Sequence, residues 1–208
     1  MTQAVDNVDL ITDINLNEYF NSAIQDAVVH QKLSPHQDTI VYIVNLLSHF
    51  ALSENIYEAD SEGLSIKPLA FIYKDAIEAS SNEEKNQQLR KLGDVALFIS
   101  GFYAQSLNRG LVGVDYFISM GGNAYSYLAG NIHRSRFNPV MSEVFTDLSD
   151  HFHEYVDVLM EVKDSAEVTG DSDVLSLYEN WMNTGSEYAR MRLQENGILT
   201  FPAGEKKH

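Results

Sequence analysis

The chain has 208 residues, enough for one domain with a sizeable buried core. Its 14 basic and 30 acidic residues give a formal charge of −16, which disfavours binding to nucleic acid and to anionic membrane surfaces, because both depend on cationic side chains. The absence of cysteine excludes disulfides, thiol catalysis and thiolate metal sites. An acidic surface favours solubility and would suit a basic protein partner.

The first twenty residues, MTQAVDNVDLITDINLNEYF, are acidic and lack the basic and apolar regions of a signal peptide. No apolar run approaches the roughly 20 residues that a membrane span needs. We therefore expect a cytosolic protein that contacts no membrane. We also expect residues 1–13 and 201–208 to be frayed.

Helical periodicity dominates the first quarter of the chain. Residues 16–30 carry apolar side chains at helical spacing, and Ser34-Pro35 is a typical helix start that predicts a second helix to about Leu52. Residues 53–67 break this pattern. They form either a long surface loop or a short β-hairpin near 55–66, because Gly63 and neighbouring acidic residues mark a turn.

The rest of the chain is also predicted to be helical. Pro68 opens a short helix to about Ala79, and residues 83–132 form two long helices joined by a turn at Arg109-Gly110. Glycine, alanine and serine recur on both, so their backbones should approach closely. Further helices are predicted over 139–162 and over 173–196. The predicted fold is an all-α single-domain bundle of about seven helices with a central antiparallel hairpin (83–132).

The first helix of this hairpin is apolar almost all round, which is typical of a buried helix. Because a buried charge must be paired, we expect Asp94 to be mostly buried and bonded to Arg90 or to a group on the 111–132 helix. One alternative is an Arg90–Asp94 pair, four residues apart, that only satisfies itself. The other is a ligand site formed by the polar strip and the polar edge of the second helix. Its candidate residues are Arg90, Asp94, Gln105, Asp115 and Asn123.

A compact basic cluster, His133-Arg134-Ser135-Arg136, lies just before the helix start at Asn138-Pro139. A helix amino terminus with nearby arginines can hold an anion, which makes His133, Arg134 and Arg136 a candidate anion site. The alternative is a surface role, in which these side chains cap the preceding helix and pair with the acidic surface.

One acidic stretch has a spacing that could hold a divalent metal. The opposite face of the same helix is apolar, and the acidic face continues to Glu161. We therefore interpret it as a solvated face and predict no metal site, no cofactor and no catalytic residue. The residues of this face are Glu143, Asp147, Asp150, His151, Glu154, Asp157 and Glu161.

Three segments are familiar together: LRKLGDVALFISGFY, VDYFISMGGNAYSYLA and LYENWMNTGSEYARMRLQENGIL. They resemble a family of uncharacterised bacterial all-helical proteins, and the likeness extends over about Leu33–Leu199. This resemblance implies a bacterial source. It implies no activity, cofactor or site residue.

Two functions remain open. The first is a non-enzymatic cytosolic interaction or regulatory module that acts as a homodimer, which the acidic charge and the lack of a catalytic constellation favour. The second is a small-molecule-binding protein, or an enzyme, that uses the polar strip around Asp94. A closed, dry Arg90–Asp94 pair would favour the first, and an open cavity beside Asp94 would favour the second.

Overall fold

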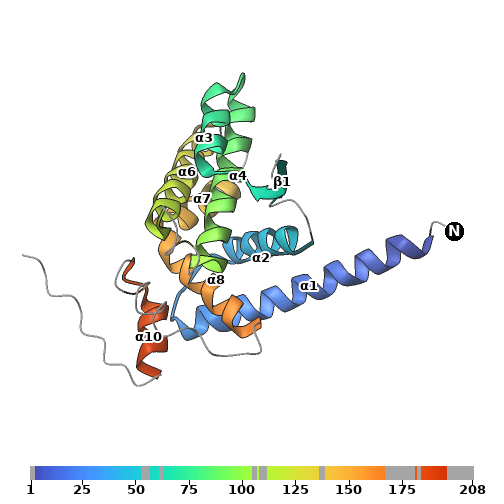
Figure 1. The fold of residues 1–208 in the computed structure, drawn as a ribbon, viewed down its shortest axis with the longest axis vertical. Coiled ribbons are helices and arrows are strands. Elements are labelled where there is room, and N and C mark those ends of the chain that lie inside the picture. Colours follow the sequence, from blue (N-terminus) through green and yellow to red (C-terminus); the bar gives the residue numbers. More distant parts are fainter. Residues whose placement is uncertain are drawn as a thin grey trace, which may run out of the picture.

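The computed structural model describes residues 3–52, 57–60, 63–104, 107, 112–135, 139–166, 181 and 184–195. They form an all-α single-domain bundle with one small β-hairpin (Figure 1). The elements are α1 (Gln3–His30), α2 (Gln37–Leu52), β1 (Tyr57–Asp60), β2 (Gly63–Ile66), α3 (Leu69–Glu78), α4 (Asn82–Phe102), α6 (Val114–Ser135), α7 (Pro139–Asp150), α8 (Phe152–Ala166) and α10 (Glu187–Glu195).

The predicted central hairpin is confirmed by α4 and α6, which pack against each other along their length. Asn131 donates a hydrogen bond to Asn86 at one end (3.2 Å), while Gly121 meets Ala96 further along. The residue numbers rise on α4 as they fall on α6, so the pair is antiparallel. Of the small residues, Gly93 and Gly121 stand at the contact, whereas Gly130 faces open space.

The segment that the sequence left open is a β-hairpin. Strands β1 and β2 pair antiparallel, from Tyr57 opposite Ile66 to Asp60 opposite Gly63. The eighth described helix arises because the predicted 139–162 helix is divided at His151, between α7 and α8. There the imidazole of His151 lies 3.3 Å from the carbonyl oxygen of Asp147, an acceptor of the helix's own hydrogen-bond ladder.

Helix α1 begins at Gln3, well before the predicted stretch of 16–30, and its amino-terminal part extends away from the other helices (Figure 1). A helix needs only local hydrogen bonds, so it can run beyond the apolar face that packs on the core. At its other end Leu33 N–H donates to the Val28 carbonyl and Lys32 N–H to the Val29 carbonyl. This pairing is a Schellman closure, with Lys32 (φ 59°) in the position that usually holds glycine.

The start of α2 differs from the prediction. The helix begins at Gln37 rather than at Ser34-Pro35, and its first turn is bonded by a carboxylate from another helix. Asp147 on α7 accepts hydrogen bonds from His36 N–H (3.3 Å) and from the Thr39 hydroxyl (2.7 Å). A cap supplied by a distant residue leaves no local pattern in the sequence. By contrast, the cap of α4 is local, since Ser81 Oγ accepts from Glu84 N–H (3.1 Å).

Two residues of the predicted solvated acidic face are buried, so that prediction was wrong for them. Asp147 also accepts from the Tyr155 hydroxyl (2.8 Å) and lies 3.0 Å from His151 Nδ1. Asp157 accepts from Ser186 Oγ (2.5 Å) and Glu187 N–H (3.1 Å), at the amino terminus of α10. Each carboxylate is satisfied by a helix start that the fold brings to it, and this offsets the cost of burial. In the described ranges, no group of three or more histidine or acidic side chains is placed to hold a metal ion.

Candidate ligand-binding groove

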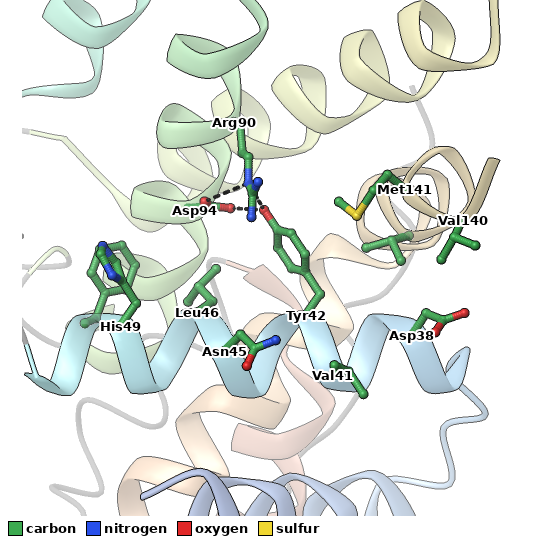
Figure 2. A pocket seen from close by; sticks show the side chains of 12 residues that line it. Asp38, Val41, Tyr42, Asn45, Leu46, His49, Arg90, Asp94, Val140 and Met141 are labelled. Carbon is green, nitrogen blue, oxygen red and sulfur yellow. Dashed lines mark hydrogen bonds and ion pairs between the residues drawn. The ribbon is translucent and has the colours of Figure 1, made fainter. Parts of the chain in front are cut away.

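A groove beside Asp94 is lined by residues of α2, α4 and α7 (Figure 2). Its volume is about 610 Å³, and an adjoining hollow of about 490 Å³ shares His49, Phe50, Arg90 and Asp94 with it. Helix α2 forms one wall, α4 carries the charged residues, and α7 supplies apolar side chains. The lining residues are Asp38, Val41, Tyr42, Asn45, Leu46, His49, Phe50, Arg90, Asp94, Val140, Met141 and Val144.

The polar centre of the groove is a network around the Asp94 carboxylate. Its Oδ1 accepts hydrogen bonds from the hydroxyls of Tyr42 (2.5 Å) and Tyr125 (2.8 Å). Its Oδ2 lies 3.7 Å from Arg90 Nε, which itself donates to the Tyr42 hydroxyl (3.1 Å). The three helices α2, α4 and α6 are therefore joined through one carboxylate.

The aromatic rings hold this network in place from behind. Tyr125 is fully buried and stacks on Phe145 of α7, with ring centroids 5.5 Å apart. Tyr42 meets the same phenylalanine edge-on at 5.6 Å. The Arg90 guanidinium lies over the Tyr42 ring, 5.1 Å from its centroid. Packing thus fixes the orientation of both hydroxyls and of the guanidinium.

The charges of the network differ in their access to solvent. The Asp94 side chain is 21% exposed and the Arg90 side chain 55%. Burial raises the pKa of Asp94, although hydrogen bonds from Tyr42 and Tyr125 and the charge of Arg90 act to lower it. Burial and the neighbouring Asp94 carboxylate raise the pKa values of Tyr42 and Tyr125. Both tyrosines therefore act as hydrogen-bond donors rather than as bases.

The prediction for Asp94 is confirmed in its main point. The carboxylate is mostly buried, and it is bonded both to Arg90 and, through Tyr125, to the second helix of the hairpin. An open cavity lies beside the Arg90–Asp94 pair, which is the feature expected for a small-molecule-binding protein rather than for a closed structural pair.

The other predicted site residues do not join this centre. Asp115 is exposed in the first turn of α6. Asn123 is exposed and lines a separate hollow of about 240 Å³ between α3, α4 and α6. Gln105 and Arg136, and the side chains of His133 and Arg134, lie outside the described residues, so the predicted anion site is untested.

Sequence reasoning missed Tyr42 and Tyr125, because tyrosine in an apolar helical pattern is typical of core. A signal for Tyr42 was present. Asp38, Tyr42, Asn45 and His49 are spaced four, three and four residues apart, which places them on one face of α2. No comparable signal marks Tyr125, since only the packing of α6 on α4 directs its hydroxyl to Asp94.

Among the described residues, no helix combines the length and apolar character that crossing a bilayer requires. The resemblance to a family of uncharacterised bacterial proteins stays a prediction. Comparisons of the chain with protein-family models, with curated protein sequences and with solved structures find no match.

Proposed function

We propose that this chain is a small-molecule-binding protein of the cytosol whose ligand occupies the groove between α2, α4 and α7. The observation that carries the proposal is the open groove of about 610 Å³ beside the Asp94 network. Sites for small molecules are typically concave, mostly apolar and of ~300–1,000 Å³, with a few placed polar groups. The groove has this character, with Leu46, Val140 and Val144 in its walls.

Binding fits the network better than catalysis does. Both tyrosine hydroxyls are committed as donors to Asp94 Oδ1, and their raised pKa values oppose ionisation. Asp94 is in turn held by these donors and by Arg90. A set of groups that fix one another in this way suits a preorganised binding surface, because little side-chain entropy is lost when a ligand arrives.

The experiment is to block the groove without disturbing the core. Val41 lines the groove and is 48% exposed, so Val41→Trp should fill the cavity at little cost to folding. Val29 on α1 is 74% exposed and is not among the residues that line the groove, so Val29→Trp is the matched control. Native mass spectrometry of each protein, purified from its own host, reports any retained ligand.

We expect a retained small molecule on the wild type and on Val29→Trp, and its loss from Val41→Trp. Retention of the same ligand by folded Val41→Trp would contradict the proposal. So would the absence of any ligand from all three proteins.

A second candidate function is homodimeric assembly as an interaction module, which a separate surface favours. On α3, Tyr73 and Ile77 are exposed, and Tyr127 of α6 is exposed beside them at the rim of the 240 Å³ hollow. Contiguous exposed apolar surface often marks a protein contact, and symmetric dimers are the commonest oligomers. A basic protein is the alternative partner, given the charge of −16.

Sedimentation at micromolar concentration tests the dimer. The wild type should sediment at twice the chain mass of 23.4 kDa, and Ile77→Glu should shift it to a single chain. Val29→Glu, also at an exposed apolar position, should stay dimeric. A wild type found only as a single chain would contradict the dimer.

A further inference from the structure

We infer that the ligand of the groove is an organic anion: a carboxylate that binds Arg90, joined to an apolar body that lies toward α7. This inference rests on the proposed function and adds the chemical class of the ligand. It follows from which hydrogen-bonding groups of the network are already used and which remain available.

The acceptors of the network are largely occupied. Asp94 Oδ1 accepts from two tyrosine hydroxyls, and the Asp94 side chain is only 21% exposed. The Tyr42 hydroxyl donates to Asp94 and accepts from Arg90 Nε. The remaining oxygen, Asp94 Oδ2, lies 3.7 Å from Arg90 Nε, so a cationic ligand bound to Asp94 would have to sit beside the Arg90 guanidinium.

The donors of Arg90 are available. Its Nε is used by Tyr42, but within the described part of the chain its two terminal nitrogens donate no hydrogen bond. The side chain is 55% exposed and points into the groove, held over the Tyr42 ring (Figure 2). Two parallel N–H groups of a guanidinium match the two oxygens of a carboxylate, and a fixed fork loses less entropy on binding.

The neighbouring surfaces set the orientation of the ligand. Lys91 lines the adjoining hollow on the α4 side, together with Arg90 and Asp94. From Arg90 toward α7 the walls are apolar, formed by Leu46, Val144 and Met141. Asp38 lies at the far end of the groove, near Val140 (Figure 2). An anion thus binds best with its charged group at Arg90 on α4, away from Asp38, and with its apolar body toward α7.

A single guanidinium favours a carboxylate over a phosphate. A phosphate monoester carries up to two charges and three strong acceptor oxygens, and it needs several donors to offset its desolvation. Here Asp94 lies 3.7 Å from Arg90, and the whole chain carries −16. A carboxylate carries one charge and needs fewer hydrogen-bond donors than a phosphate, so it fits this environment better.

Calorimetric titration with matched ten-carbon probes tests the inference. Decanoate, decanol, decylamine and decyl phosphate share one apolar body and differ in the head group. The proteins are the wild type, Arg90→Gln, Arg90→Lys and Lys85→Gln. Lys85 is the matched control, because it lies on the same helix over the ring of Tyr127, 4.7 Å from its centroid, and lines the other hollow.

We expect decanoate to bind the wild type and Lys85→Gln with equal affinity. On both proteins it should bind more tightly than decanol, decylamine or decyl phosphate. Arg90→Gln should weaken the binding of decanoate by about tenfold or more and leave the binding of decanol unchanged. Arg90→Lys keeps the charge but loses the two parallel N–H groups, so its affinity for decanoate should lie between those of the wild type and Arg90→Gln. It also keeps the test valid if Arg90→Gln fails to fold, since a folded Arg90→Lys that binds decanoate as tightly as the wild type would overturn the inference.

Three other results would overturn the inference and leave the proposed function standing. They are equal binding of decanoate by the wild type and Arg90→Gln, tighter binding of decylamine, and tighter binding of decyl phosphate. If no probe binds and blocking the groove with Val41→Trp removes no retained ligand, the proposed function itself fails.

Discussion

Tyr125 occupies the space that any side chain at position 93 would need. A Cβ built on Gly93 would lie 2.5 Å from Tyr125 Cε1 and 2.8 Å from Cδ1. The ring cannot move aside freely, because it is fully buried, stacks on Phe145 and bonds Asp94. The glycine on α4 therefore sets how closely α6 approaches and where the Tyr125 hydroxyl reaches the network.

Gly93→Ala should destabilise the fold for this reason. Overpacking a core costs about 1–3 kcal/mol, and alanine's better helix propensity returns only about 1 kcal/mol of it. Gly130→Ala on α6 is the control, since a Cβ there meets nothing within 4 Å and should stabilise by about 0.5–1 kcal/mol. Urea unfolding of both variants measures the two free energies. If both variants stabilise the fold equally, the Tyr125 ring moves away from position 93 without loss of stability, and the prediction is wrong.

Asp94→Ala should lower the free energy of unfolding by about 3 kcal/mol, because it removes the acceptor of two tyrosine hydroxyls and the partner of Arg90. Asp94→Asn should cost less, since its carbonyl oxygen still accepts from one or both hydroxyls. Thermal and urea unfolding check both. If Asp94→Ala unfolds at the wild-type midpoint, the network contributes nothing to stability.

Asp147 should make the fold sensitive to acid. Burial acts to raise its pKa, but hydrogen bonds from Thr39, Tyr155 and His36 N–H together lower it below the usual value of 3.8. A lowered folded-state pKa gives stability that is present above the unfolded-state pKa and is lost as pH falls through the folded-state pKa.

Urea unfolding from pH 7 down to pH 3 measures this dependence. Asp147→Asn should be the less stable protein at pH 7, and its curve should approach that of the wild type at the acidic end. The exposed Asp150, three residues along the same helix, gives the control Asp150→Asn, which should follow the wild type throughout. A constant gap between Asp147→Asn and the wild type across this range would contradict the prediction.

Duplex DNA should not bind measurably at physiological salt. The formal charge of −16 repels phosphate, and affinity for nucleic acid comes mostly from cationic side chains. Fluorescence anisotropy with a labelled duplex checks this. A micromolar dissociation constant that weakens as salt rises would contradict it.

Local patterns in the sequence determined the helices and the central hairpin. Apolar spacing predicts one face formed by Leu89, Leu92, Ala96, Ile99, Tyr103 and Leu107. The four that lie within α4, from Leu89 to Ile99, are buried, whereas Tyr103, just after the end of the helix, is exposed. The spacing of four residues likewise brought Arg90 and Asp94 together. These predictions hold because a helix turns by a fixed angle per residue, so the face of each residue can be read from its number.

Only the tertiary structure decided which polar groups become buried and what satisfies them. Asp147 and Asp157 are buried because the starts of α2 and α10 reach them with hydrogen-bond donors, while Asp150 on the same acidic face stays exposed. Tyr42 and Tyr125 come to Asp94 from two other helices. Contacts between distant elements depend on how helices rotate and cross, and periodicity within one helix carries no record of that choice.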